Sequence, residues 1–266
     1  MALHDKLTVV AIYGHNSGES AVPSLERSLL ELPGAQGLLI SPRRPRNLPK
    51  HIRHKKCHKM TYKQYSLFVM YCLHTYIKTE FCLIVQDDGW VLNGENFTED
   101  YYQYDYVGAP AHAAMVGNNY YTHFTWIGQP EALVVQNGGF SLRSRKLLRQ
   151  LSKSGIIWKH FDVEPFCNED VQLCTWLRPE LEKHGIKFAP IEVAKNFSME
   201  YAGPGFHDDI DFSKLVGHHA PTRKLTSYNY IKIKAPLSEV SNYYREMEFL
   251  DWLQTKDYVL ECYEPS

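Results

Sequence analysis

Short apolar runs alternate with helical stripes along the first forty residues of the chain. Leu7 to Tyr13 is apolar and β-branched, which is typical of a buried strand. Apolar side chains at 22, 25, 29 and 32 keep the spacing of one helical face, and Pro33-Gly34 ends that pattern. Residues 37–40 form a second apolar run. The order strand, helix, strand predicts a parallel, Rossmann-like sheet with helices on its faces.

The middle of the chain continues this alternation. Thr61 is placed to cap a helix whose apolar positions run to residue 76, and that helix leads into an apolar strand at 81–86. Residues 105–110 and 133–136 predict two further strands, and a helix follows through about Leu151. Residues 111–130 are rich in Gly, Asn, Tyr and His without periodicity, which predicts a long loop over a site.

The last third predicts one more helix, one more strand and a helical tail. Asn168 is a suitable N-cap for a helix with a buried stripe at 171, 174, 177 and 181, ended by Gly185. Residues 186–193 predict a strand, and apolar positions between Val240 and Leu253 keep helical spacing. We expect an α/β domain over residues 1–225 and a C-terminal helical extension, residues 226–266, packed on the same domain.

Composition places the chain among folded globular proteins. Hydrophobic residues make up 44% and charged residues 22% of the sequence, close to ordinary averages. The N-terminus lacks the features of a signal peptide, and no segment approaches the ~20 apolar residues that a membrane span needs. The six cysteines are scattered rather than arranged as a disulfide framework. These features predict a cytoplasmic protein without a membrane span.

Charge is balanced over the whole chain but not locally. The formal net charge of −1 argues against a general polyanion binder. Residues 43–59 nevertheless concentrate arginine, lysine and histidine, a composition that attracts phosphate-bearing partners. Because Pro42, Pro45 and Pro49 interrupt regular structure there, the alternative is a solvated loop.

The strand at 81–86 ends in an acidic turn. Five apolar residues run into Gln86, Asp87 and Asp88, with Gly89 behind them. Ligands of open α/β sheets collect at the carboxyl ends of strands, and paired acids there suit a divalent cation that holds a diphosphate. The same residues also make a good plain turn.

Four blocks in the order of the chain carry a family resemblance. They are residues 79–93, 104–110, 137–145 and 168–171, followed by the shorter segments 188–190 and 197–200. In these blocks the chain resembles an uncharacterised bacterial and viral family of GT-A-like glycosyltransferases. The resemblance covers roughly residues 60–221. It implies a nucleotide-sugar-dependent transferase with a GT-A-like, Rossmann-related, mostly parallel central sheet flanked by helices.

The resemblance also implies a donor site. In this fold class an acidic turn of the form Asp-x-Asp binds the metal and the sugar diphosphate, and here Gln86, Asp87 and Asp88 occupy it. Glutamine is a poorer ligand for a divalent cation than a carboxylate, so Asp88 is the preferred metal ligand. His219 resembles the late histidine that completes the metal site in many GT-A enzymes. We expect Mn²⁺ or Mg²⁺, and a UDP-sugar as the donor.

The catalytic prediction falls on the acids that begin the helix after Asn168. By similarity to inverting GT-A families, Asp170 is the first choice and Glu169 the second for the base that deprotonates the acceptor hydroxyl. A base on the face opposite the leaving group gives inversion. The alternative is that both acids only stabilise the helix dipole, by ~0.3–1 kcal/mol each.

The remaining predicted contacts lie on the loops after the strands. Tyr13 stands where the nucleoside binds in this architecture. Asn137, Gly138 and Gly139 are expected to line the donor or acceptor pocket, because glycines let the backbone approach a ligand; a tight structural turn is the alternative. Aromatic residues of the 111–130 segment are candidates for stacking on an acceptor sugar, or for core packing: Tyr120, Tyr121, Phe124 and Trp126.

Several functions fit these residues. The leading hypothesis is an inverting, metal-assisted glycosyltransferase whose acceptor is a hydroxyl, for example on a surface glycan. One variant places a nucleic acid or a modified base in the acceptor site, with the basic stretch 43–59 as its contact. Two others are a non-catalytic module that binds sugar nucleotides or glycans, and a metal-dependent hydrolase.

Overall fold

The structure is a computed structural model that describes residues 3–153, 155 and 157–263. Seven strands form its central sheet: β1 (Leu7–Ile12), β2 (Gln36–Ser41), β3 (Ile52–Lys56), β4 (Phe81–Ile84), β6 (Tyr106–Val116), β7 (Asn119–Tyr121) and β8 (Leu133–Ser144). Their order is β3-β2-β1-β4-β8-β6-β7. Neighbours from β3 to β4 pair in parallel, whereas β8 is antiparallel to β4 and β6, and β7 is antiparallel to β6. Five of these strands therefore point one way, which confirms the mostly parallel α/β fold.

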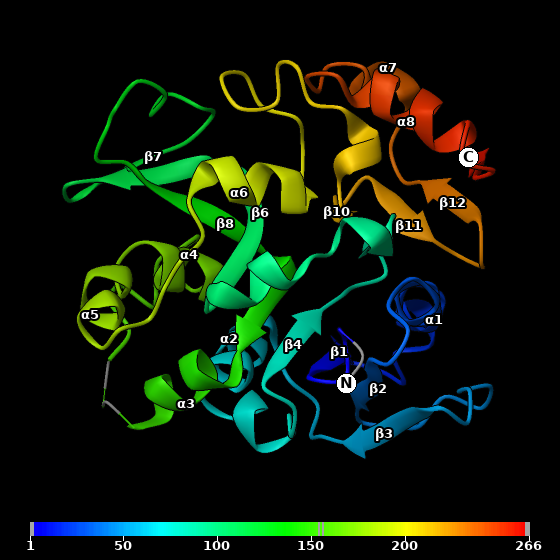
Figure 1. Cartoon of the computed structure of the whole chain (residues 1–266), viewed down its shortest axis with the longest axis horizontal. Coiled ribbons are helices and arrows are strands. Elements are labelled where there is room, and N and C mark those ends of the chain that lie inside the picture. Colours follow the sequence, from blue (N-terminus) through cyan, green and yellow to red (C-terminus); the bar gives the residue numbers. More distant parts are fainter. Residues whose placement is uncertain (1–2, 154, 156, 264–266) are drawn as a thin grey trace.

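Helices cover both faces of this sheet (Figure 1). They are α1 (Val22–Glu31), α2 (Tyr62–Tyr71), α3 (Arg145–Lys153), α4 (Glu169–Cys174), α5 (Arg178–Lys183) and α6 (Ile191–Phe197). Leu25 of α1 packs in one cluster with Val9 and Leu83, whereas Val69 of α2 packs in another with Val10. Successive side chains of a strand point to opposite faces, so the continuous apolar strands read from the sequence are buried on both sides.

Helix α2 begins at the position predicted from the sequence, directly after Thr61. Thr61 accepts a hydrogen bond from the Gln64 amide at 3.3 Å, and the Gln64 side chain accepts one from the Thr61 amide at 2.9 Å. This reciprocal capping box satisfies two backbone donors that a helix start leaves unpaired. It fixes the place where α2 enters, beside the end of β4.

A small three-stranded sheet joins the strand after the acidic turn to two strands from late in the chain. Its strands are β5 (Gly89–Val91), β10 (Gly217–His219) and β9 (Ser198–Met199), in the order β5-β10-β9. β5 follows the acidic turn directly and pairs antiparallel with β10, so that His219 lies opposite Gly89. This pairing brings a residue from late in the chain to the turn after β4.

The C-terminal part contains strands as well as the expected helices. It comprises β11 (Arg223–Leu225), β12 (Tyr230–Ile233), α7 (Leu237–Val240), α8 (Glu246–Gln254) and β13 (Val259–Glu261). β12 pairs with β11 and β13, and Ile231 and Phe249 share a core cluster with Trp90 of β5. Figure 1 shows these elements together beside β10. The division at residue 225/226 stays a prediction.

The basic stretch 43–59 is not a loop throughout, because Ile52–Lys56 forms β3 at the edge of the sheet. Its side chains Arg53, Lys55 and Lys56 are charged and half-buried or exposed. Positive charge on an edge strand opposes pairing with another chain. Protection of this edge strand is therefore a structural reason for the positive charge of residues 53–56.

The predicted loop at 111–130 is partly strand. β6 continues to Val116 and turns back through β7, so Pro110 does not end it. The register between β6 and β8 shifts on both sides of Pro110, which fits a residue that cannot donate a ladder hydrogen bond. β8 in turn runs without a break through Asn137, Gly138 and Gly139, so the alternative of a tight turn at these residues is wrong.

The predicted helix at 168–185 is two helices, α4 and α5. Pro179 stands in the first turn of α5, where its missing amide is tolerated, but it cannot continue a helix that comes from α4. Asn168 occupies the N-cap position without a side-chain capping hydrogen bond. The strand predicted at 186–193 is reduced to a single bridge between Tyr106 and Phe188, after which α6 begins at Ile191.

Short 3-10 helices complete the described secondary structure: η1 (Glu19–Ala21), η2 (Leu73–Thr75), η3 (Gly94–Asn96), η4 (Glu99–Gln103) and η5 (Phe212–Lys214). Within the described ranges, no helix has the length and apolar character needed to cross a membrane.

Candidate functional site

A pocket lies where β1 and β4 end. The two strands are parallel neighbours, so the segments that follow them emerge at the same edge of the sheet. The pocket has a volume of about 240 Å³ and is lined by Ile12, Tyr13, Gly14, His15, Tyr62, Tyr65, Gln86 and Asp87. Residues of the first loop and of the acidic turn thus line one pocket.

Tyrosines hold the acidic turn in this pocket. The Asp87 amide donates to the Tyr13 hydroxyl at 3.1 Å, and Gln86 Nε2 donates to the Tyr65 hydroxyl at 3.3 Å. Burial, followed by the charge of Asp87, raises the pKa of Tyr13, so its hydroxyl stays neutral. Tyr62 and Tyr65 stack with ring centroids 6.4 Å apart. Aromatic rings with fixed polar groups suit a flat, polar ligand such as a nucleoside.

Asp88 and His219 meet beside this pocket. His219 Nε2 lies 3.2 Å from Asp88 Oδ1 and 3.2 Å from Gln86 Oε1. Burial raises the pKa of Asp88, but contact with His219 and the charges of His219 and Lys234 outweigh it and hold the pKa below its usual value. Burial lowers the pKa of His219, but Asp88, aided by Glu200, raises it above its usual value. Each of the two groups therefore favours the charged form of the other.

Two glycines of β8 connect this pair to the acidic helix start. A Cβ at Gly139 would lie 2.3 Å from His219 Nε2, and a Cβ at Gly138 would lie 2.5 Å from Glu169 Oε1. The Asn137 side chain holds the segment by accepting a hydrogen bond from the Gly139 amide at 2.6 Å. Only a backbone without side chains fits between His219 and Glu169, so four segments distant in sequence converge here.

A Gly139→Ala substitution tests this close approach. The added methyl group would displace the His219 ring, so we expect binding of Mn²⁺ with a nucleoside diphosphate to be lost and stability to fall by about 1–3 kcal/mol from overpacking. Calorimetric titration and thermal unfolding measure the two effects.

Gly117→Ala is the control for Gly139→Ala. A Cβ at Gly117 meets nothing within 4 Å, although its φ of +59 carries a backbone cost. Its metal and nucleotide binding should equal that of the wild type. Unchanged binding in Gly139→Ala would contradict the role assigned to His219.

The two acids of α4 have different environments. Glu169 is buried, and its Oε1 accepts a hydrogen bond from Arg143 NH2 at 2.8 Å; the side chains are 5% and 0% exposed. Asp170 is half-buried and accepts hydrogen bonds from the Gly138 amide at 2.9 Å and the Val171 amide at 2.8 Å. Glu169 is thus tied to the core by an ion pair, whereas Asp170 stays accessible beside the glycines.

The pKa of Asp170 lies near neutrality. Burial, followed by the charge of Glu169, raises the pKa of the Asp170 carboxyl from its ordinary value to about 7, against the opposing hydrogen bonds from the Gly138 and Val171 amides. A carboxylate with such a pKa exchanges a proton near neutral pH, which suits a general base. The helix dipole alone would favour the ionised carboxylate and lower its pKa. The raised pKa of Asp170 is therefore not explained by a role in stabilising the helix dipole.

Several residues of the site escaped prediction. Lys224 Nζ lies 3.1 Å from Asp87 Oδ2, and Lys234 Nζ lies 3.7 Å from Asp88 Oδ2. Glu200 has its pKa raised by burial, against the charges of His219 and His112 and a hydrogen bond from Asn137. Glu200 stands in one of the resemblance segments, but nothing in the sequence marks the two lysines, which reach the turn only through the fold of the C-terminal part.

The residues fit a divalent cation in part. Within the described part of the chain, no group of three His, Cys, Asp or Glu side chains is arranged to hold a metal. His219 Nε2 carries at most one hydrogen, so it cannot donate a full hydrogen bond to both Asp88 Oδ1 and Gln86 Oε1. Among the described residues, Asp88 Oδ1 has no regular hydrogen bond. One carboxylate, one imidazole and one amide oxygen therefore share a space that a cation would satisfy, with ligand oxygens completing its shell.

Comparison with known proteins places the chain in a family. A profile described as "Protein of unknown function (DUF5672)" matches residues 53–215. The chain belongs to this family. The DUF5672 match includes the acidic turn, Asn137 to Gly139 and the start of α4, whereas His219 lies just beyond it. No curated protein matches the sequence.

Solved structures identify the fold of this DUF5672 member. The crystal structure of the galactosyltransferase LgtC in complex with donor and acceptor sugar analogs has a TM-score of 0.51 at 13% identity, over 81% of this chain and 88% of that chain. An active-site mutant of LgtC has a TM-score of 0.45 at 12% identity, over 80% and 87% of the two chains. A CMP:2-keto-3-deoxy-manno-octonic acid synthetase complexed with CTP has a TM-score of 0.38 at 10% identity, over 68% and 86%. The chain has the α/β fold of GT-A glycosyltransferases.

Proposed function

We propose that the protein is a metal-assisted glycosyltransferase that moves a sugar from a nucleotide-sugar donor, a UDP-sugar, to a hydroxyl of an acceptor glycan. One observation carries the proposal: Gly138 and Gly139 lie between the Asp88–His219 pair and Asp170. The proposed diphosphate site and the proposed base are thereby adjacent, which is what transfer from a sugar diphosphate requires. The fold shared with LgtC supports the same class of reaction.

The donor is assigned to the pocket at the ends of β1 and β4. Tyr13, Tyr62 and Tyr65 supply the aromatic walls for the nucleoside. Lys224 and Lys234, which contact the carboxylates of the acidic turn, supply positive charge for the diphosphate. Charge of this kind stabilises a leaving group that becomes more negative during transfer.

Asp88 and His219 are the proposed metal ligands, with Gln86 Oε1 beside them. When bound there, a divalent cation supplies Lewis-acid charge to the diphosphate. A histidine ligand favours Mn²⁺ over Mg²⁺, because magnesium prefers oxygen ligands.

Asp170 is the proposed base. A sugar hydroxyl is too weakly acidic to attack unaided at neutral pH, so a carboxylate must take its proton during transfer. Hydrogen bonds from the Gly138 and Val171 amides fix the orientation of the Asp170 carboxylate. Inversion at the anomeric carbon stays a prediction, and proton NMR of the first product formed measures it.

The alternative functions have less support. The basic stretch 43–59 contributes β3 at the edge of the sheet. Four strands lie between β3 and β6, namely β2, β1, β4 and β8. We therefore do not assign the basic stretch to the acceptor site. A non-catalytic binding module does not need an accessible carboxylate with a pKa near neutrality. A hydrolase would need water as the acceptor, and it is distinguished by donor cleavage that added glycans leave unchanged.

The donor proposal predicts a metal-dependent stabilisation. UDP at 100-fold over its dissociation constant should stabilise the fold by about 2.7 kcal/mol, more strongly with Mn²⁺ than without. Asp88→Asn and His219→Ala should remove the Mn²⁺-dependent part of the thermal shift. Each loses a ligand of the proposed cation but leaves the tyrosine-lined pocket in place.

Asp100→Asn is the matched control, because Asp100 is an exposed acid in η4. It should show the wild-type shift. A panel of other nucleoside diphosphates identifies the base. The absence of a shift with every nucleotide, with or without Mn²⁺, would overturn the proposed function.

A further inference from the structure

A second cavity, larger than the donor pocket, lies at the end of β9. Its volume is about 510 Å³. It is lined by Pro110, Ala111, His112, His123, Phe124, Glu200, Tyr201, Ala202, Pro204, Asn242, Tyr243 and Tyr244. These residues come from β6, from the turn after β7, from the segment after β9 and from the segment between α7 and α8, so only the tertiary structure assembles the cavity.

Glu200 connects this cavity to the candidate site. It directly follows β9, whose Met199 pairs with His218 of β10. Because β9 and β10 pair in parallel, Glu200 follows Met199 just as His219 follows His218, which places these two residues side by side. The Glu200 backbone is fixed, because its carbonyl accepts a hydrogen bond from Arg223 NH2 at 2.9 Å. A ligand in the cavity would therefore lie next to the proposed diphosphate site.

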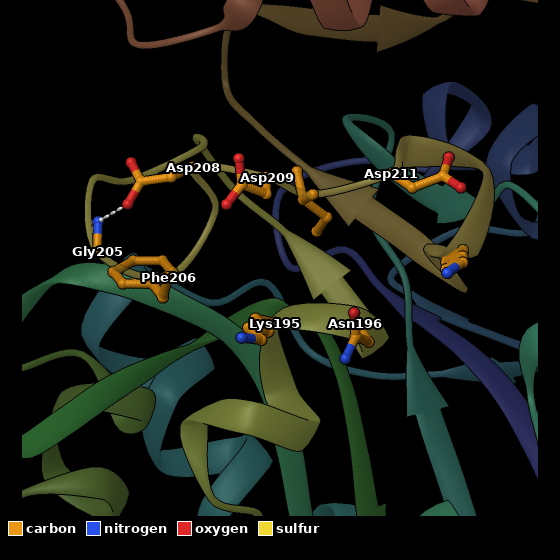
Figure 2. A pocket seen from close by; sticks show the side chains of 9 residues that line it. Lys195, Asn196, Gly205, Phe206, Asp208, Asp209 and Asp211 are labelled. Carbon is orange, nitrogen blue, oxygen red and sulfur yellow. Dashed lines mark hydrogen bonds between the residues drawn. The ribbon is translucent and has the colours of Figure 1, made fainter.

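Aromatic rings form the outer wall of the cavity. Tyr201 and Tyr243 stack with centroids 4.4 Å apart and an interplanar angle of 8°, and Tyr243 is 36% exposed. The neighbouring Tyr244 hydroxyl donates to Asp208 Oδ1 at 2.8 Å. Asp208 also accepts a hydrogen bond from the Gly205 amide at 2.7 Å; Figure 2, a view of a different pocket lined by Gly205 and Asp208, draws this bond within their loop. The wall is thus built from side chains that are fixed in place.

Another part of the lining contains a strained backbone. His123 and Phe124 have φ values of 54 and 61, which are uncommon for residues other than glycine. The Phe124 amide donates to the His112 carbonyl at 2.9 Å, and this bond holds the Phe124 ring against the cavity. Strain of this kind persists where the surrounding structure enforces it, often at ligand sites.

The chemistry of the lining selects the ligand. Ring faces of Phe124 and Tyr243 suit the apolar C–H face of a sugar, and the carboxylate of Glu200 and the imidazole of His112 suit its hydroxyls. Glu200 is negatively charged when ionised, which disfavours a phosphate-bearing ligand such as a nucleic acid. A neutral polyhydroxylated ring matches both features.

We propose that this cavity is the acceptor subsite and that it binds a neutral pyranose of a glycan; the inference rests on the proposed glycosyltransferase function. Tyr243 and Phe124 contact the face of the pyranose, and Glu200 accepts a hydrogen bond from one of its hydroxyls. Of the aromatic residues predicted from sequence to meet an acceptor, Phe124 lines this cavity, whereas Trp126 is buried and donates to the His112 carbonyl.

Saturation-transfer NMR with methyl pyranosides tests the subsite. The probes are the methyl glycosides of glucose, galactose, mannose and N-acetylglucosamine, with UDP and Mn²⁺ present. At least one should bind the wild type, and Tyr243→Ala and Glu200→Gln should weaken that binding about tenfold. Tyr230→Ala, a change at an exposed tyrosine of β12 outside the lining, is the matched control and should bind as the wild type does.

The thermal shift with UDP and Mn²⁺ separates this inference from the proposed function. Tyr243→Ala should keep the wild-type shift, because Tyr243 does not line the donor pocket. Wild-type protein that responds to UDP but binds none of the pyranosides would overturn the acceptor subsite alone. Equal pyranoside binding by the wild type, Tyr243→Ala and Glu200→Gln would overturn it as well.

Discussion

Replacing Asp170 with asparagine should lower kcat for sugar transfer by about 10²–10⁴-fold, the range for loss of a general base. Asparagine keeps the size of the side chain and can still accept a hydrogen bond from the Gly138 amide. It cannot take up a proton at this position. UDP binding with Mn²⁺ should be retained, because Asp170 is not among the residues that line the donor pocket. Steady-state rates and the thermal shift measure the two properties.

The pH dependence of the same carboxylate provides a second readout. Burial and the charge of Glu169 raise the pKa of Asp170 to about 7, so wild-type kcat should increase as the pH rises through about 7 and the base becomes ionised. Stability should change in the opposite direction. The folded state holds the Asp170 proton more tightly than the unfolded chain does. The resulting contribution to the free energy of unfolding is therefore full below the ordinary pKa of 3.8 and is lost as the pH rises through about 7. Urea unfolding at about pH 5 and about pH 9 measures this effect. The wild type should lose this part of its free energy of unfolding between the two pH values, and Asp170→Asn should not.

Asp162→Asn is the control for both experiments, since Asp162 is an exposed acid in the segment before α4. Its kcat and its pH profile should equal those of the wild type. A wild-type kcat in Asp170→Asn, or a pH profile that the substitution leaves unchanged, would remove Asp170 from the proposed chemistry.

Replacing Arg143 with methionine should destabilise the protein by about 3–5 kcal/mol, the cost of breaking a buried ion pair. The Arg143 side chain is fully buried and bonds to Glu169 Oε1 at 2.8 Å. It also donates through Nε to Ser141 Oγ at 3.0 Å, and its guanidinium lies 5.1 Å from the centre of the Tyr106 ring. Its removal leaves a carboxylate in the core without a positive partner. Chemical denaturation measures the free energy of unfolding.

Two further variants make this test specific. Arg178→Met breaks an i,i+4 pair with Glu182 on α5, where Glu182 is 45% exposed, so its cost should be only about 0–1 kcal/mol. Combining Arg143→Met with Glu169→Leu should recover part of the loss, because no unpaired charge then remains in the core. An Arg143→Met protein no less stable than Arg178→Met would show that the Arg143–Glu169 pair does not hold α4 to β8.

These two experiments address a distinction between neighbouring acids. Glu169 and Asp170 are adjacent in the first turn of α4; the family resemblance favours Asp170 over Glu169 as the base, and the sequence leaves open that both only stabilise the helix dipole. The structure separates them, because Arg143 pairs with Glu169 from within β8 while Asp170 stays half-buried beside Gly138. Glu169 is therefore tied to β8 through Arg143, whereas Asp170 is the more accessible of the two acids and the one to which we assign the role of base.

Local patterns in the sequence determined the elements that build the sheet. Apolar runs and helical stripes predicted β1, α1, β2, α2 and β4 in the correct order, and Thr61 marked the start of α2. These predictions hold because burial on one or two faces leaves a periodic record in consecutive residues. The acidic turn was predictable for a similar reason, since polar residues directly after a buried strand must lie at its end.

Pairing between distant segments was decided only by the tertiary structure. The sequence did not indicate that 52–56 would add an edge strand, that β6 would continue past Pro110, or that Pro179 would divide the predicted helix. It also did not indicate that Lys224 and Lys234 would reach the acidic turn, or that Glu200 would line the second cavity. Contacts of this kind depend on how β10 pairs with β5 and how the C-terminal part packs on Trp90. The sequence by itself therefore determined the parts of the sheet and the acidic turn, and the packing of distant segments determined which side chains share the site.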